Sequence, residues 1–114
     1  MANEMHDIIE TVAGSQAKFA VLKLFKENPY IMDNRYGLSL WVGKPEEMLA
    51  PELEEMVDMG LLQRWGKDVG AIYAYTRNQD MRRALDEHWD EISRRASENR
   101  WRQNYAVRPG REEE

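Results

Sequence analysis

Two short segments rich in β-forming residues, 61–65 and 71–76, enclose a loop, 66–70, that begins and ends with glycine. Segments of this length around a glycine-containing loop are typical of a β-hairpin. In much of the remaining chain the apolar residues recur every three or four positions, which is the period of an amphipathic helix. The sequence therefore predicts a mainly α fold with one small β-hairpin.

Apolar spacing and capping residues predict five helices around the hairpin. Their ranges are 3–13, 16–27, 35–41, 45–60 and 77–98. Gly14 ends the first helix, while Ser15 and Asn34 have side-chain oxygens suited to capping the second and third. Pro51 lacks the N–H of a helical hydrogen bond, so we expect a kink there or a helix that begins there. Thr76, three residues before a glutamine, has the spacing of a capping box for the last helix.

Composition excludes several kinds of chemistry. The 114 residues include no cysteine, which excludes disulfides, thiolate zinc sites, iron–sulfur clusters and a cysteine nucleophile. No apolar run approaches the roughly 20 residues that span a membrane. His6 and His88 are the only histidines. We expect a cytoplasmic, non-membrane, non-enzymatic protein with no metal site and no cofactor.

Charge is distributed unevenly along the chain, whose net charge is −5. Residues 1–75 carry seven basic and 12 acidic side chains, whereas residues 76–111 carry nine arginines and six acidic side chains. Such asymmetry indicates an interaction surface or tail. We expect an N-terminal amphipathic helix (1–14), a central domain (15–76), a long C-terminal helix (77–98) and an arginine- and aromatic-rich tail that ends in three glutamates (99–114).

The central domain resembles a winged helix-turn-helix domain. Residues 15–29 resemble its first helix, 36–43 its second helix and turn, 51–62 its third helix running into a strand, and 62–65 and 72–76 its wing strands. The helix after the hairpin is similar to that of dimerising bacterial regulators of the PadR and MarR type. The resemblance implies a winged helix-turn-helix flanked by an N-terminal and a long C-terminal helix, transcription regulation, and a homodimer. The implied dimer interface is Met81, Leu85, Trp89 and Ile92.

In the winged-helix family the third helix usually enters the DNA major groove, where lysine and arginine supply most of the affinity. Here the matching helix, 45–60, has six carboxylates and neither lysine nor arginine. Contact with phosphates would be repulsive. Three interpretations stay open: a solvated face that binds nothing, an acidic surface for a protein partner, and insertion into DNA. The candidate protein-binding residues are Glu47, Glu54, Glu55 and Asp58.

The tail is a second candidate surface, because its arginines alternate with aromatic residues. This pattern suits phosphate contact and base stacking, or an anchor in a protein groove. It also fits a helix end whose cations oppose the helix dipole, followed by a segment that binds nothing. The tail could equally dock on the acidic helix of its own or a partner subunit. The candidate residues are Arg100, Trp101, Arg102 and Tyr105.

These patterns predict an adaptor or regulatory subunit that binds a protein partner through its acidic third helix, its tail or both. The alternative is a dimeric DNA-binding transcription regulator. Its candidate contacts are Lys18, Lys23, Lys44, Arg64 and Lys67. A third hypothesis is a sensor of aromatic small molecules with a pocket lined by Trp41, Trp65 and Tyr73, although we expect these three rings to pack in the core.

Overall fold

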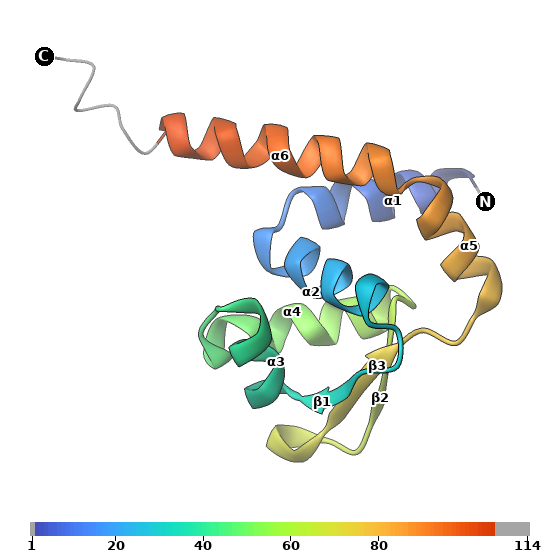
Figure 1. Ribbon diagram of the computed structural model, residues 1–114, viewed down its shortest axis with the longest axis vertical. Helices are drawn as coiled ribbons and strands as arrows, with labels where there is room; N and C mark the ends of the chain where they lie inside the picture. Colours follow the sequence, from blue (N-terminus) through green and yellow to red (C-terminus); the bar gives the residue numbers. More distant parts are fainter. Residues whose placement is uncertain (1, 107–114) are drawn as a thin grey trace, which may run out of the picture.

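The structure is a computed structural model that describes the backbone of residues 2–106 and the side chains of residues 4–99 (Figure 1). This part of the chain is mainly helical and has a small antiparallel sheet, which confirms the predicted fold class. The elements follow in the order α1 (Ala2–Ala13), α2 (Gln16–Glu27), β1 (Met32–Asn34), α3 (Arg35–Val42), α4 (Glu46–Asp58), β2 (Leu62–Trp65), the 3-10 turn η1 (Asp68–Gly70), β3 (Ile72–Tyr75), α5 (Gln79–Glu87) and α6 (Trp89–Ala106).

The predicted hairpin is present, and a third strand extends it. Strand β3 lies between β2 and β1 and pairs antiparallel with both. Tyr73 stands opposite Arg64 on one side and Asp33 on the other. Strand β1 was not predicted, because three residues are too few to show an alternating pattern.

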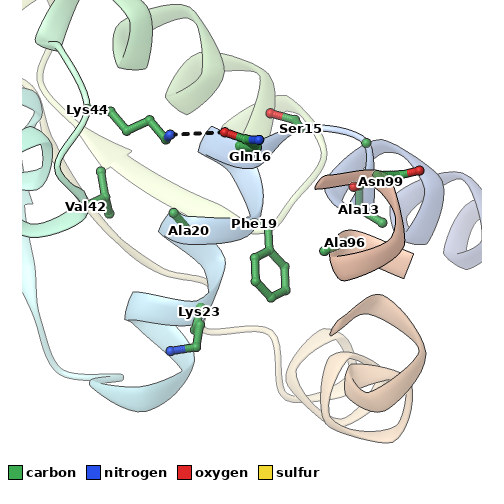
Figure 2. Close-up of a pocket in the computed structure, with 11 residues that line it drawn as sticks. Ala13, Ser15, Gln16, Phe19, Ala20, Lys23, Val42, Lys44, Ala96 and Asn99 are labelled. Carbon is green, nitrogen blue, oxygen red and sulfur yellow. Dashed lines mark hydrogen bonds between the residues drawn. The ribbon is translucent and has the colours of Figure 1, made fainter. Parts of the chain in front are cut away.

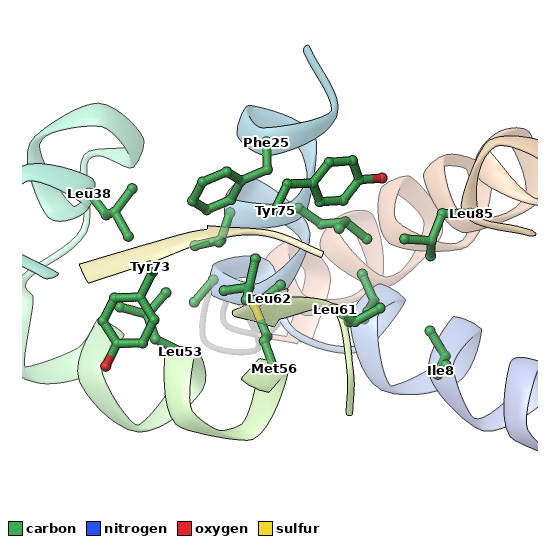
Figure 3. Packing of buried hydrophobic residues seen from close by; sticks show 14 of the residues in the cluster. Ile8, Phe25, Leu38, Leu53, Met56, Leu61, Leu62, Tyr73, Tyr75 and Leu85 are labelled. Carbon is green, nitrogen blue, oxygen red and sulfur yellow. The ribbon is translucent and has the colours of Figure 1, made fainter. Parts of the chain in front are cut away.

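The core lies where α2, α4 and the sheet meet (Figure 3). Phe25 of α2 and Met56 of α4 are fully buried, and Leu62 and Tyr75 of the sheet are nearly so. The rings of Phe25 and Tyr75 are stacked with their centroids 6.5 Å apart. The apolar stripe of each helix faces this cluster, as the helical period requires.

Local chain signals account for most helix ends. The side chains of Ser15 and Asn34 each accept a hydrogen bond from the backbone N–H three residues later, as predicted for N-caps. Helix α4 ends at Asp58, and Gly60, which follows the C-cap Met59, has a φ of +82° that is favourable for glycine. The N–H of Leu61 then reaches the carbonyl of Met56, which closes the helix in a Schellman motif.

One local prediction is wrong, and one of two alternatives is excluded. Helix α4 begins at Glu46 and continues through Pro51, so it does not start at the proline, and the kink at Pro51 stays a prediction. The N-cap of α5 is Asn78, whose side chain accepts a hydrogen bond from the N–H of Met81, and not Thr76. The Thr76 hydroxyl instead accepts from the N–H of Asn78, two residues away. An asparagine closer to the helix therefore replaces the expected capping box.

The predicted single helix over 77–98 is two helices separated at His88. This turn lets α6 lie along α1, where the side-chain amide of Asn99 donates to the Ala13 carbonyl at 2.9 Å. Helix α6 continues to Ala106, so the boundary expected near residue 99 is also wrong. No helix within the described residues is both long and apolar enough to cross a bilayer.

Candidate docking surface

Eight large apolar side chains are exposed on the described part of the chain. Their exposed fractions range from 42% to 92%, and all lie between residues 30 and 69. They are Tyr30, Met32, Tyr36, Leu40, Trp41, Met48, Trp65 and Val69. In the described portion of α1, α2, α5 and α6 no large apolar residue is comparably exposed. Scattered exposed apolar residues are ordinary, whereas several that lie together mark an interaction site.

Helix α3 presents the centre of this surface. Its inner side buries Leu38, whereas Tyr36 and Leu40, one turn apart, point outward. Helix α3 contacts both η1, which carries the exposed Val69, and α4, whose first turn carries the exposed Met48. We define the apolar face by the members that α3 and its two neighbours contribute: Tyr36, Leu40, Trp41, Met48 and Val69.

The expectation that Trp41 and Trp65 pack in the core is wrong. Trp41 is 60% exposed and Trp65 is 42% exposed, whereas Tyr73 is buried as expected. The guanidinium of Arg77 lies 5.5 Å from the centroid of the Trp65 ring. The two tryptophans are therefore surface residues, which sequence reasoning missed because aromatic residues are usually internal.

Several carboxylates of the acidic helix α4 form ion pairs with residues of other elements. The ammonium of Lys18 on α2 lies 2.5 Å from carboxylate oxygens of both Glu52 and Glu55. The Ser15 hydroxyl also donates to Glu52, at 3.2 Å. Burial alone would lower the pKa of Lys18, but the hydrogen bonds to the two glutamates outweigh it and raise the pKa above its ordinary value.

Two further carboxylates of α4 are paired. Glu54 accepts hydrogen bonds from Arg64 and from the Tyr73 hydroxyl. Burial and the bond to Glu54 raise the pKa of Tyr73 to about 12. Glu46 accepts from Arg35 at 2.9 Å. The outer side of α4 is therefore less negative than its sequence suggests.

The predicted acidic binding residues therefore divide into two kinds. Glu54 and Glu55 have internal partners, although Glu55 stays largely exposed. Glu47 and Asp58 are exposed and form no ion pair with another described residue. The part of α4 available to a partner is its outer edge at Glu47, Glu55 and Asp58.

The candidate DNA-contacting cations do not converge. Lys18 is only 4% exposed and is paired, and Arg64 is bound to Glu54. Lys23 and Lys44 line a hollow beside α2, and Lys67 lies in the loop between β2 and β3. The structure thus brings only Lys23 and Lys44 to a common site.

The residues of the predicted dimer interface pack against the core of their own chain. Leu85 and Ile92 are fully buried. Met81 and Trp89 are partly buried against the same core, and the Trp89 ring stacks on Phe19 with 5.4 Å between centroids. The regular apolar spacing of residues 81–92 therefore serves intramolecular packing in this structure, and of the four predicted interface residues only Met81 and Trp89 keep some exposure.

The tail candidates Arg100, Trp101, Arg102 and Tyr105 lie on the backbone of α6, but their side chains are outside the described residues. Across the described residues, no group of three or more histidine or carboxylate side chains is placed to hold a metal ion. Near the apolar face, the described surface offers apolar area and the carboxylates of Glu47, Glu55 and Asp58.

No family model matches this chain, and neither the curated proteins nor the solved structures contain a match.

Proposed function

We propose that the protein is a non-enzymatic, cytoplasmic winged-helix module that docks on a protein partner through the apolar face. The observation that carries this proposal is the confinement of the large exposed apolar side chains to residues 30–69. Interfaces bury a central apolar patch inside a polar rim. Leu40 and Trp41 would form that centre, since aromatic and large aliphatic anchors supply most binding energy.

The charges beside the apolar face indicate the chemistry of the partner. Met48 belongs to the same helix as Glu47, Glu55 and Asp58, which form the available edge of α4. A partner segment that is apolar on one side and basic on the other would satisfy both parts of the surface. We therefore propose a basic amphipathic helix as the occupant.

The same charges argue against DNA as the main partner. Helix α4 has no cation of its own, and Lys18 and Arg64 are already paired with its carboxylates. Affinity for DNA depends on cations that can replace the counterions of phosphates. A dimeric DNA-binding regulator remains the alternative outcome of the test below.

The test uses a helical peptide of leucine and lysine, about 18 residues long, and a matched peptide of leucine and glutamate. The full chain should bind the basic peptide with a micromolar dissociation constant and the acidic peptide at least about tenfold more weakly. The double variant Leu40→Asp, Trp41→Asp should lose binding, because it places charge in the centre of the apolar face. Calorimetry measures the affinities, and circular dichroism checks folding.

A matched control places the same charge elsewhere. The double variant Gln79→Asp, Ser97→Asp alters two exposed neutral residues, on α5 and α6, and should bind like the wild type. Equal loss in both variants would contradict the assignment of the face. Tight binding to duplex DNA at about 50 mM salt, with a steep salt dependence, would support the alternative instead.

A further inference from the structure

A hollow of about 330 Å³ lies between the start of α2, the end of α3 and α6 (Figure 2). Phe19, Ala20, Val42 and Ala96 supply its apolar wall. Lys23 and Lys44 also line it. None of the lining residues is acidic, although the chain as a whole has a net charge of −5.

The hollow exists because small residues stand where helices meet. Ala20 of α2 and Ala96 of α6 both line it, and Ala13 and Gly14 border it at the turn between α1 and α2. Larger side chains at these positions would fill the space, as they do in the core beside it. The volume is at the lower end of the range for small-molecule sites, which suits a ligand of one or two rings.

The two lysines are held only loosely. Lys23 pairs with Glu27 at 3.1 Å, but both side chains are more than half exposed, and such pairs contribute little. The ammonium of Lys44 lies 3.5 Å from the side-chain oxygen of Gln16, which is the limit for a hydrogen bond (Figure 2). Either cation can therefore turn to an incoming anion at small cost.

We propose that this hollow binds a small organic monoanion with a compact apolar body. The apolar body would lie against Phe19, Ala20 and Ala96, and the carboxylate would lie beside one of the two lysines, Lys23 and Lys44, which stand at opposite ends of the hollow (Figure 2). The hollow is formed by α2, the end of α3 and α6, so a bound ligand would tie α6 to the winged part of the chain. This site is separate from the apolar face and does not depend on the docking function.

The test uses 2-naphthoate and its neutral analogue 2-naphthamide as probes for the full chain. Naphthoate should bind with a dissociation constant below about 1 mM, and the amide at least about tenfold more weakly. Backbone amide signals in NMR spectra should shift around Ala20, Val42 and Ala96. Equal binding of the two probes, shifts confined to other elements, or no binding of naphthoate at about 5 mM would each overturn the proposal.

Variants of lysines inside and outside the hollow distinguish binding at this site from general attraction of an anion to surface cations. The double variant Lys23→Gln, Lys44→Gln should weaken naphthoate binding at least about tenfold, while Lys67→Gln, which changes an exposed lysine of the wing, should leave it unchanged. Equal weakening in both would overturn the assignment. The double variant Leu40→Asp, Trp41→Asp should still bind naphthoate, so failure of the docking proposal is distinguishable from failure of this one.

Discussion

Lys18 of α2 and Glu52 of α4 form an ion pair of 2.5 Å in which the lysine is almost fully buried. By sequence, the lysine is a candidate DNA contact and the glutamate belongs to an acidic face. In the fold the ammonium of Lys18 and the carboxylate of Glu52 neutralise each other. Ser15, the N-cap of α2, donates a further hydrogen bond to the same carboxylate. Charges that sequence reasoning assigned to binding therefore stabilise the packing of α2 on α4.

Replacing Lys18 by methionine should lower the free energy of unfolding by about 2 kcal/mol. Loss of one partner from a fully buried ion pair costs about 3–5 kcal/mol, and the cost here is smaller because Glu55 remains largely exposed. Denaturant unfolding measures the change. Lys23→Met removes an exposed pair and should change stability by less than about 0.5 kcal/mol. Similar losses in both variants would contradict the role of Lys18.

The contribution of Lys18 should depend on pH at the alkaline end. Its pKa is raised in the folded state, so the stabilisation is fully present below its unfolded pKa of about 10.5 and is lost as the pH rises through the folded value. The difference in stability between the wild type and Lys18→Met should be constant from about pH 6 to 9 and shrink above about pH 10.5. A difference that persists undiminished at higher pH would exclude the charged contact as its cause.

Tyr73 and Tyr75, two residues apart on β3, should respond in opposite directions to loss of the hydroxyl. Tyr73→Phe should destabilise the protein by about 1 kcal/mol, because the hydroxyl donates to Glu54. Tyr75→Phe should be neutral or stabilising by up to about 1 kcal/mol, because its buried hydroxyl has no hydrogen-bond partner in the described structure. Thermal and denaturant unfolding of the two variants test this prediction, and equal losses would contradict it.

The same two tyrosines should reduce stability at high pH. Burial raises the pKa of both to about 12, whereas an ordinary tyrosine ionises near 10. The unfolded chain therefore releases these protons first, so their contribution is complete below about pH 10 and is lost toward about pH 12. Absorbance of tyrosinate, followed during a pH titration, should show this late ionisation, which Tyr73→Phe should diminish.

Leu85→Ala and Ile92→Ala should each lower the free energy of unfolding by about 2–5 kcal/mol, as expected for fully buried residues. The loss should be independent of protein concentration, because both residues pack within one chain. Unfolding measured at two concentrations that differ about a hundredfold tests this. A loss that grows at high concentration would indicate that these residues stabilise an association between copies.

Gly37→Ala should destabilise the protein, since a Cβ at this position would overlap the carboxylate of Asp33. That carboxylate accepts a hydrogen bond from the N–H of Asn34 at 2.8 Å, so it cannot move away freely. We expect a loss of more than about 1 kcal/mol. In an Asp33→Ala background the same substitution should cost much less, and a double-mutant cycle measures the coupling.

Features that depend on near neighbours in the chain were predictable. Ser15, Asn34 and Gly60 act through residues within a few positions, so their roles follow from sequence patterns. The pairing of Lys18 with Glu52 joins residues 34 positions apart and needs the fold itself. Strand β1 likewise forms because its backbone pairs with the free edge of β3, whereas its own three residues favour no strand.

The candidate site was harder to predict than the core for a physical reason. Leu38 and Leu40 are identical residues in one short helix, yet the first is fully buried and the second is 67% exposed. An eight-residue helix contains only about two turns, so its apolar pattern does not show which side faces inward. The exposed face of α3 therefore became visible only with the packing of α4 and the sheet.

The packing of α6 along α1 has a practical consequence for studying the protein. These helices carry both ends of the described chain, and they lie on the opposite side of the molecule from α3 and the strands (Figure 1). A fusion tag or immobilisation linker joined to the described chain at Ala2 or Ala106 would thus start from the far side of the molecule. Sensor chips and display libraries can use either orientation and still present Leu40 and Trp41 to solution.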